Sequence, residues 1–338
     1  MSQKPIPVIA IHGGAGTILR SAMNAELEQR YNQALSGILQ AGAALLAAGA
    51  PALEAVTEAV RLLEECPLFN AGKGAVYTEA GGHELDACVM DGATLAAGAV
   101  AGVTRVRNPV LAARVVMQHS GHVLMIGPAA QDYVAQHGIE LVDPNWFDTP
   151  ERLAQLQRAQ QAAGGAMLDH DGATSLAKDA AEEAAPLDPD RKFGTVGAVA
   201  LDANGKLAAA TSTGGMTNKR VGRVGDTPVV GAGCYANDRV AVSCTGSGEM
   251  FIRAVAAYDV SALMEYAGLS LEEATRRVVQ DKLMRIDGRG GLIAVDAQGG
   301  VALSFNTEGM YRGYARVGQA PVFAIYGDDG DAGDGAAS

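Results

Sequence analysis

Arg191-Lys-Phe-Gly-Thr-Val-Gly-Ala-Val-Ala200 is the stretch at which the chain divides into two unlike parts. The preceding residues, 157–192, are polar and rich in alanine, which is typical of a flexible linker. The following residues, Thr195–Leu201, are apolar and lead to a turn at Asp202–Gly205. The pattern therefore predicts a buried strand that begins at Thr195, directly after a linker.

Two interpretations of the junction between Gly194 and Thr195 stay open at this point. Gly194 has no Cβ, so the bond after it can be held in a strained geometry. The Thr195 hydroxyl can then attack the Gly194 carbonyl, and hydrolysis of the ester would give Thr195 a free α-amine. Such a residue carries both a nucleophile and a base that titrates near neutral pH. The simpler interpretation is a β-branched residue that opens an ordinary strand.

The composition describes a soluble globular protein of one or two domains. The chain has 338 residues, of which 48% are hydrophobic and 19% charged. Its formal net charge is −12 and it has no run of Lys or Arg, which argues against nucleic-acid and anionic-membrane partners.

The cysteines and the N-terminus predict a cytoplasmic protein. The four cysteines lack CxxC spacing, which argues for reduced thiols and against a zinc site or a disulfide framework. The N-terminal apolar run is short and interrupted by proline, so we interpret it as a first strand and not as a signal peptide. No segment approaches the length of a membrane span.

Hydrophobic periodicity predicts alternating groups of helices and strands. Helices are expected at Ala25–Ala48, Pro51–Glu65, Pro109–Ser120, Ala129–His137, Pro150–Gln161, Met250–Tyr258 and Ser270–Arg285. Strands are expected at Pro7–Ile11, Leu85–Met90, Ala97–Val106, Val123–Ile126 (as a buried strand) and Val240–Cys244. After Thr195 two hairpins repeat one pattern, Gly197–Asp202 with Leu207–Ala210 and Gly291–Asp296 with Val301–Phe305. Together these elements predict a layered architecture of sheets covered by helices on both outer faces.

Three strand exits carry hydroxyls and glycine amides. They are Thr213-Gly-Gly215, Thr245-Gly-Ser-Gly-Glu249 and Asn306-Thr-Glu-Gly309. Such groups can bind a developing oxyanion, although each exit alone is also typical of a plain turn.

Two loops have a ligand interpretation and a plain one. In Arg223-Val-Gly-Asp226, the guanidinium could hold the α-carboxylate of an amino acid and the carboxylate its α-ammonium, or the two could form a surface ion pair. His12-Gly-Gly-Ala-Gly16 could cradle a phosphate, but without GxGxxG or Lys-Ser/Thr we prefer a tight turn. We interpret His12 and His83 as packed or hydrogen-bonded structural residues.

These pieces together resemble the isoaspartyl peptidase/L-asparaginase family, the plant-type asparaginases among the N-terminal-nucleophile hydrolases, and its bacterial isoaspartyl aminopeptidases most of all. The resemblance covers nearly the whole chain except the linker and the acidic tail. The matching stretches are Ile11–Gly16, Leu63–Gly72, Gly74–Val76, His83–Gly92, Arg107–Val110, Gly194–Val199, Thr211–Lys219, Gly222–Asp226, Gly231–Asn237, Cys244–Gly246 and Asn306–Tyr311.

The resemblance implies an α+β fold, a four-layer αββα sandwich in which two antiparallel sheets lie between helix layers. It implies a single domain over residues 1–338 that is cut before Thr195. The α subunit would be residues 1–194, with the flexible linker 157–192 at its end. The β subunit would be residues 195–338, with a disordered tail at 327–338, and two αβ protomers would form a dimer.

The resemblance also implies the site. Thr195 would be the nucleophile, supported by Thr213, with Asn70 near its amine, and Gly194–Thr195 would be the cleaved bond. Thr245 and Gly246 would form the oxyanion hole. The substrate would be held by Arg223, Val224, Gly225, Asp226, Thr245, Gly246, Ser247 and Gly248. No cofactor would serve catalysis, and a structural Na⁺ would bind the backbone carbonyls of Leu63, Glu64, Cys66, Phe69, Ala71 and Lys73. At two positions the sequence differs from the family pattern: Lys73 stands where an apolar residue is expected, and Ser247 where Thr is common.

The function implied is release of L-aspartate from β-aspartyl (isoaspartyl) dipeptides and hydrolysis of L-asparagine to aspartate and ammonia. Two alternatives are a glycosylasparaginase-type amidase and a non-catalytic α/β protein that binds a phosphate ligand through residues 12–16. A processed but inactive scaffold is a third, although no catalytic group is missing from the sequence.

Overall fold

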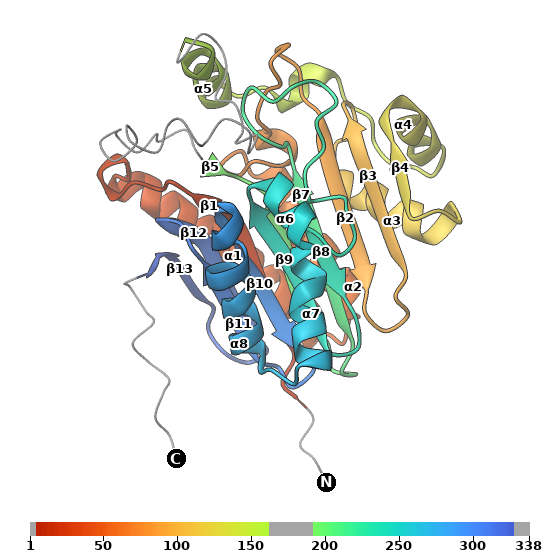
Figure 1. Ribbon diagram of the computed structural model, residues 1–338. Helices are drawn as coiled ribbons and strands as arrows, with labels where there is room; N and C mark the ends of the chain where they lie inside the picture. The colour runs from red at the N-terminus through yellow and green to blue at the C-terminus, as the bar shows by residue number, and fades with distance from the viewer. Residues whose placement is uncertain (1–4, 162–191, 328–338) are drawn as a thin grey trace.

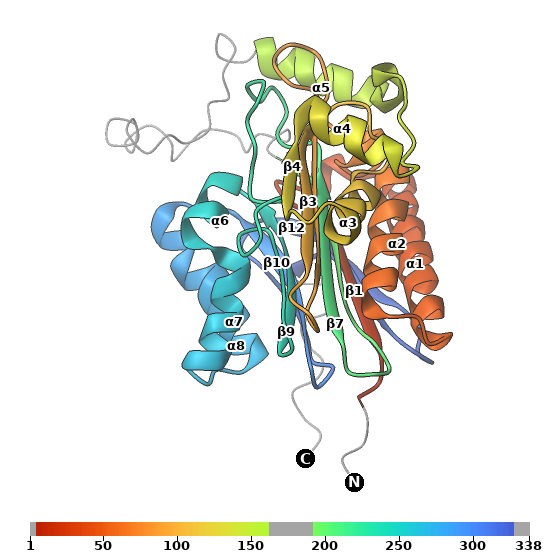
Figure 2. The same cartoon turned by 90° about the vertical axis from the view of Figure 1, so that its right-hand side faces the viewer.

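Two β-sheets pack face to face and helices cover the outer face of each, which makes the predicted four-layer αββα sandwich (Figure 1; Figure 2). The structure is a computed structural model that describes residues 5–161 and 192–327. The linker prediction for residues 162–191 and the tail prediction for residues 328–338 lie outside the described residues.

The larger sheet has the strand order β13-β12-β1-β6-β7-β2-β3-β4. The short strand β5 pairs with the end of β1, at Ala15 and Gly16. The smaller sheet has the order β11-β10-β9-β8. All pairs are antiparallel except β3 with β4, which is parallel, so the prediction of purely antiparallel sheets was wrong at that edge. The strands are β1 (Val8–Gly16), β2 (Leu85–Asp91), β3 (Ala97–Val103), β4 (Leu124–Ile126), β5 (Lys192–Phe193), β6 (Val196–Leu201), β7 (Leu207–Thr213), β8 (Cys234–Ala236), β9 (Val240–Gly246), β10 (Gly290–Asp296), β11 (Val301–Phe305), β12 (Gly309–Arg316) and β13 (Val322–Tyr326).

Two groups of helices form the outer layers, and Figure 2 shows them on opposite sides of the paired sheets. The larger sheet is covered by α1 (Ala25–Ala47), α2 (Ala52–Glu65) and α3 (Pro109–His119), with α4 (Gly127–Gln136) and α5 (Pro150–Gln161) at its far end. The smaller sheet is covered by α6 (Gly248–Ala254), α7 (Ala256–Tyr266) and α8 (Leu271–Arg276), which continues into a π-helical segment at Arg277–Lys282. Short 3₁₀ turns lie at Arg20–Ala22, Gly72–Gly74, Pro144–Phe147 and Met284–Ile286.

Strand alternation explains why three apolar layers form. In β1, Ile9 and Ile11 face the helices α1 and α2, whereas Val8 and Ala10 face the smaller sheet. A third cluster, which includes Phe251 and Val260, lies between the smaller sheet and α6–α8. Because successive side chains of a strand point to opposite faces, a strand buried on both faces is expected to be apolar throughout, as β6 is and as β1 is except at His12.

Several predicted boundaries need correction. The glycines of residues 13–16 do not form a turn, since they continue β1 through a bulge between His12 and Gly14. The strand after the junction begins at Val196, one residue later than predicted. Two ends of the predicted linker are regular structure, because residues 157–161 belong to α5 and Lys192 pairs in β5.

Other corrections concern the later helices and the sheet edges. The helix predicted at Met250–Tyr258 is two helices, because Val255 adopts a left-handed conformation (φ 50°) between α6 and α7. The helix predicted at Ser270–Arg285 changes from α to π after Arg276. The strand predicted as buried at Val123–Ile126 is an edge strand with Ile126 65% exposed. Strands β5, β8, β12 and β13 were not predicted.

Candidate active site

The junction between Gly194 and Thr195 interrupts one line of pairing along β1. Before it, Phe193 of β5 pairs with Ala15; after it, Gly197 of β6 pairs with His12. The two junction residues therefore lie opposite the glycine bulge of β1, outside any ladder. Thr195 is buried, with 7% of its surface exposed.

The Thr195 hydroxyl lies next to a second threonine. Its Oγ1 donates to Oγ1 of Thr213 over 3.2 Å, and the amide of Gly215 donates to the same Thr213 oxygen over 3.0 Å. Thr213 is the last residue of β7, which pairs with β6. The structure thus brings together the predicted nucleophile and its predicted support.

Asn70 contacts both the junction and the exit of β7. Its Nδ2 donates to the Gly215 carbonyl over 2.6 Å, its own carbonyl accepts from the Gly214 amide over 3.2 Å, and its Oδ1 accepts from the Val76 amide over 2.9 Å. Gly194 packs so closely on the Asn70 side chain that a Cβ at position 194 would collide with it. This contact explains the glycine before Thr195 by close packing.

The predicted oxyanion groups lie at the end of β9. Thr245 is fully buried, and its Oγ1 accepts from the backbone amide of Ala15 over 3.3 Å. Ala15 is also the β1 residue that pairs with Phe193, two positions before Thr195. Thr245 and Gly246 are thereby held close to the junction through β1.

The third strand exit has a structural role. Asn306 accepts from the Gly290 amide through Oδ1 over 2.8 Å and donates to the carbonyls of Val279 and Gly288 over 3.0 and 2.9 Å. Gly290 pairs with Gly246, so Asn306 fixes the strand beside the oxyanion candidate.

Arg223 and Asp226 meet at Gly248. A Cβ on Gly248 would lie 2.8 Å from Nη2 of Arg223 and 3.1 Å from Oδ1 of Asp226. The absence of a side chain at position 248 therefore keeps the space between the cation and the carboxyl open. Arg223 also makes a bidentate pair with Glu249, since Nε and Nη2 each donate to one Glu249 oxygen over 2.8 Å.

Glu249 was missed as a site residue by the sequence analysis, although it ends the quoted Thr245–Glu249 stretch. It stands in the first turn of α6, where the helix dipole favours an acidic side chain. Burial tends to raise the pKa of Glu249, but the paired Arg223 outweighs it and the pKa lies below its usual value. Glu249 is thus an ionised anchor that fixes the guanidinium.

The remaining residues of the predicted substrate set lie around the clamp formed by Arg223 and Asp226. A Cβ on Gly225 would lie 3.1 Å from Nη1 of Arg223, and Val224 is 38% exposed. The Ser247 hydroxyl donates to the Arg289 carbonyl over 3.2 Å and accepts from its amide over 3.3 Å. Ser247 therefore connects the start of α6 to the loop that precedes β10.

Asp226 is buried, and its carboxyl group is a weaker acid than an exposed aspartate. Burial raises the pKa of Asp226 to about 7, although the charge of Arg223 opposes the shift. Two more buried ionisable residues lie nearby: burial raises the pKa of Asp86 and lowers that of Lys219, while each charge partly offsets the shift of the other. Asp86 pairs with Thr213 in the sheet, which links this charged group to the nucleophile's support.

The two histidines of the matched stretches are buried and hydrogen-bonded. His12 Nε2 lies 2.9 Å from the Ser243 hydroxyl, and burial lowers the His12 pKa to about 3, so the ring is neutral near neutral pH. His83 bonds the Val76 carbonyl through Nδ1 over 3.1 Å and Asp148 through Nε2 over 3.0 Å.

The loop between α2 and Val76 packs two glycines tightly against backbone carbonyls. A Cβ on Gly72 would collide with the Glu64 carbonyl oxygen, and a Cβ on Gly74 with those of Phe69 and Pro67. Carbonyl oxygens therefore approach both positions so closely that only glycine fits, and Gly72 also needs its left-handed φ of 51°. Within the described residues no group of three or more His, Cys, Asp or Glu side chains could hold a metal ion. The Lys73 side chain donates to the Trp146 carbonyl and lies over its ring, which accounts for a lysine at this position.

Glu64 links this loop to β7, the strand that ends at Thr213. The sequence analysis assigned no role to its side chain, which looks like an ordinary helix charge in α2. Its Oε1 accepts from the Ser212 hydroxyl over 2.7 Å and from the Val110 amide over 2.9 Å. The side chain is fully buried, and burial raises its pKa to about 8. Ser212 precedes Thr213, so Glu64 fixes the end of β7.

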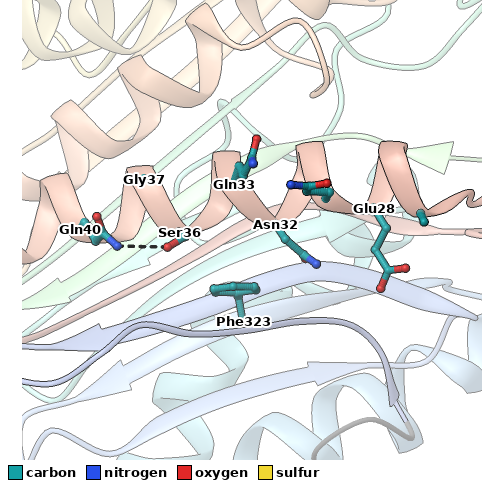
Figure 3. Close-up of a pocket in the computed structure, with 9 residues that line it drawn as sticks. Glu28, Asn32, Gln33, Ser36, Gly37, Gln40 and Phe323 are labelled. Atoms are coloured by element: carbon teal, nitrogen blue, oxygen red, sulfur yellow. Dashed lines mark hydrogen bonds between the residues drawn. The ribbon is translucent and has the colours of Figure 1, made fainter.

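Of two pockets in the described part of the chain, one contains predicted site residues and the other does not. One, of about 290 Å³, is lined by Gly194, Asn70 and residues 13–15. The other, of about 570 Å³, runs along the outer face of α1 beside Phe323 of β13 and contains none of the predicted site residues (Figure 3).

The chain is similar to known proteins along nearly its whole length. A family profile described as Asparaginase matches residues 5–325. The chain is 60% identical over 325 residues to an isoaspartyl peptidase of Escherichia coli (strain K12), covering 96% of this chain and 97% of that protein. It is 62% identical over 320 residues to an isoaspartyl peptidase of Salmonella typhimurium, covering 94% and 98%. It is 38% identical over 324 residues to a plant-type L-asparaginase of Pyrococcus abyssi, covering 92% and 96%. Among the described residues no helix is long and apolar enough to cross a membrane.

Proposed function

The chain belongs to the asparaginase family, and from this premise we propose that it is a self-cleaving threonine hydrolase that releases L-aspartate from β-aspartyl dipeptides and from L-asparagine. The observation that carries the proposal is the hydrogen bond between two hydroxyls at the junction, from Thr195 Oγ1 to Thr213 Oγ1. Beside it, the Ala15 amide of β1 donates to the hydroxyl of Thr245. A nucleophile, its support and an oxyanion donor are the groups that amide hydrolysis requires.

Self-cleavage begins with attack of Thr195 Oγ1 on the Gly194 carbonyl carbon. The bond between that carbon and the Thr195 nitrogen breaks, the nitrogen keeps the proton from the hydroxyl, and an ester joins the two residues. Water hydrolyses the ester, which leaves a carboxylate on Gly194 and a free α-amine on Thr195. The position of Gly194 outside the ladder and against Asn70 supports this step.

Turnover uses the same hydroxyl, now with the α-amine of Thr195 as its base. The amine takes the hydroxyl proton while Oγ1 attacks the substrate's side-chain amide carbon. The Thr245 hydroxyl and the Gly246 amide would stabilise the oxyanion, and the proton passes to the leaving nitrogen. Water then hydrolyses the ester and releases aspartate.

The direct test is an assay of aspartate release from L-asparagine, from β-aspartyl-leucine and from an N-glycosylated asparagine. We expect the first two to be hydrolysed and the third to be resistant. Release from the glycosylated substrate alone would instead establish a glycosylasparaginase. The phosphate-binding alternative has no support from the fold, because residues 12–16 continue a strand and no helix N-terminus follows them directly.

We expect the KM for L-asparagine to rise as the pH falls below about 7. Asp226 must be ionised to hold the substrate ammonium, and burial raises its pKa, so the binding form is lost in mildly acidic solution and not near pH 4. Steady-state kinetics across this pH range measure the effect. The control is His12→Asn, which should show the same rise of KM at low pH, because the His12 ring is neutral across this pH range. A KM that stays constant from weakly acid to weakly alkaline pH would contradict the role of Asp226.

A structural Na⁺ in the loop of residues 63–73 is part of the proposal. Leu63, Glu64, Cys66, Phe69, Ala71 and Lys73 would offer neutral carbonyl oxygens, which suit a hard cation. The ion would supply rigidity to the loop that carries Asn70, and the close approach of carbonyls to Gly72 and Gly74 supports the site.

Exchange of Na⁺ for choline at equal ionic strength should lower the melting temperature by several degrees. An ion that binds only the folded state stabilises it by about 2.7 kcal/mol at one hundred times its dissociation constant. Differential scanning calorimetry in the two salts measures the shift, and return of Na⁺ should restore it. Equal melting temperatures in the two salts would argue against a bound Na⁺.

Assembly and compartment complete the proposal. We place two cut αβ protomers in a heterotetramer and the protein in the cytoplasm; the first rests on the family alone. The second is supported by four free cysteines, Cys66, Cys88, Cys234 and Cys244, of which the last three are buried.

A further inference from the structure

A cavity of about 290 Å³ opens where the leaving group of the reaction would depart. Its wall includes Gly194, whose bond to the Thr195 nitrogen is the one cut, and Asn70, which packs on Gly194. It also includes Ala15, whose amide donates to Thr245. The cavity therefore touches both the cut bond and the residue behind the oxyanion donor.

The chemistry of the reaction sets the direction of the leaving group. The α-amine of Thr195 must lie within hydrogen-bond reach of the leaving nitrogen, because it returns the proton to that atom. Before cleavage the same amine nitrogen is bonded to Gly194. The part of a substrate beyond its scissile amide thus extends from the neighbourhood of Gly194, and Arg223, Asp226 and Gly248 do not line this cavity.

One side of the cavity is cationic in a chain whose net charge is −12. Among the described residues, Arg30, Arg152 and Arg158 line it together with one acid, Glu151. Arg152 is half-buried and fixed, since its Nε donates to the Gly74 carbonyl over 2.8 Å and its Nη1 to Gln155 over 3.0 Å. A fixed guanidinium among further arginines suits a carboxylate.

The other side is apolar and aromatic. Tyr31 and Tyr311 stack with ring centroids 4.1 Å apart and an interplanar angle of 18°, and Leu27 and Leu68 continue the wall. The volume is at the small end for a ligand pocket, which suits one amino acid better than a long peptide. Ammonia, the leaving group of L-asparagine, has neither a carboxylate nor a side chain to use these surfaces.

We propose that this cavity binds the amino acid that leaves from a β-aspartyl dipeptide, with its α-carboxylate at the arginines and its side chain against Tyr31 and Tyr311. The inference rests on the proposed function and deepens it, because it makes dipeptides that end in a free carboxylate the preferred substrates. In the acylation step the β-amide C–N bond breaks as the Thr195 ester forms, and the free amino acid departs with the proton from the α-amine.

The experiment compares kcat/KM for β-aspartyl-leucine, its C-terminal amide and L-asparagine. The wild-type protein should prefer the free acid over the amide by about tenfold, as for one lost charge-assisted contact. Arg152→Met should abolish this preference, with a larger fall in kcat/KM for β-aspartyl-leucine than for L-asparagine. Arg158→Met on the exposed face of α5 should reduce the preference without affecting the fold. The matched control is Arg114→Met in α3, which should leave kcat/KM unchanged for every substrate.

The possible results separate this inference from the function on which it rests. Turnover of L-asparagine with equal rates on the acid and the amide overturns the cavity assignment alone. An equal loss on all substrates in both arginine variants does the same. Failure of the wild-type protein to release aspartate from any of the three overturns the proposed function and the assignment together.

Discussion

Thr195→Ala is expected to remain one uncut chain and to lose turnover of L-asparagine by about 10⁴-fold or more, because in the proposed mechanism one residue supplies the nucleophile, the base and the cleavage site. The wild-type protein should separate on a denaturing gel into residues 1–194 and 195–338, and the smaller fragment should begin with Thr195. In the variant, no hydroxyl is present to attack the Gly194 carbonyl. Gel analysis, N-terminal sequencing and aspartate release measure the three parts of the expectation.

The matched control for this variant is Thr195→Ser, which keeps the hydroxyl and, after cleavage, the amine. Its hydroxyl can still donate to Thr213, so cleavage and turnover should persist at reduced rates. The two variants differ by groups too small to change the fold at a site that is 7% exposed. A wild-type protein that hydrolyses L-asparagine at full rate while uncut would show that the free amine is not required.

The layers of the fold were predictable because the chain repeats simple local signals. Both hairpins after the junction carry an apolar strand, a turn with Asp and Gly, and a second apolar strand, and both occur as predicted in β6–β7 and β10–β11. Motifs and the family resemblance selected the candidate clamp and nucleophile residues, and the structure brings Arg223 together with Asp226 at Gly248 and Thr195 together with Thr213.

The missed elements depend on contacts between distant residues. Strand β12 was not predicted because Gly309, Gly313 and two arginines break its apolar pattern, yet Arg312 is only 4% exposed and donates to the carbonyls of Met310 and Tyr326. The left-handed conformation of Val255, which separates α6 from α7, could not be predicted from the sequence either, since valine disfavours that conformation. Glu64 and Glu249 look like ordinary helix charges until Ser212 and Arg223 are placed beside them.

Arg223→Ala is expected to reduce kcat/KM for L-asparagine by about 100-fold or more while self-cleavage stays largely intact, since loss of a charged contact in a buried site costs about 2–5 kcal/mol. The Nε–Nη2 edge of Arg223 is held by Glu249, and we place the substrate α-carboxylate on the Nη1–Nη2 edge, next to Gly248. In the proposed function the clamp contacts the substrate and not the Gly194 carbonyl, so the two activities should separate.

The same variant should move the pH dependence in a defined direction. Arg223 is the cation that opposes the raised pKa of Asp226, so its removal should raise that pKa above about 7 and shift the rise of KM to higher pH. Arg223→Lys is the control, because it keeps a positive charge that favours the Asp226 carboxylate but cannot form two bidentate pairs. It should therefore retain the wild-type pH limb while losing affinity. Kinetics at several pH values, with a denaturing gel of each variant, measure both effects. Unchanged kcat/KM in Arg223→Ala would remove Arg223 from the substrate site, and an unshifted limb would show that Asp226 does not sense it.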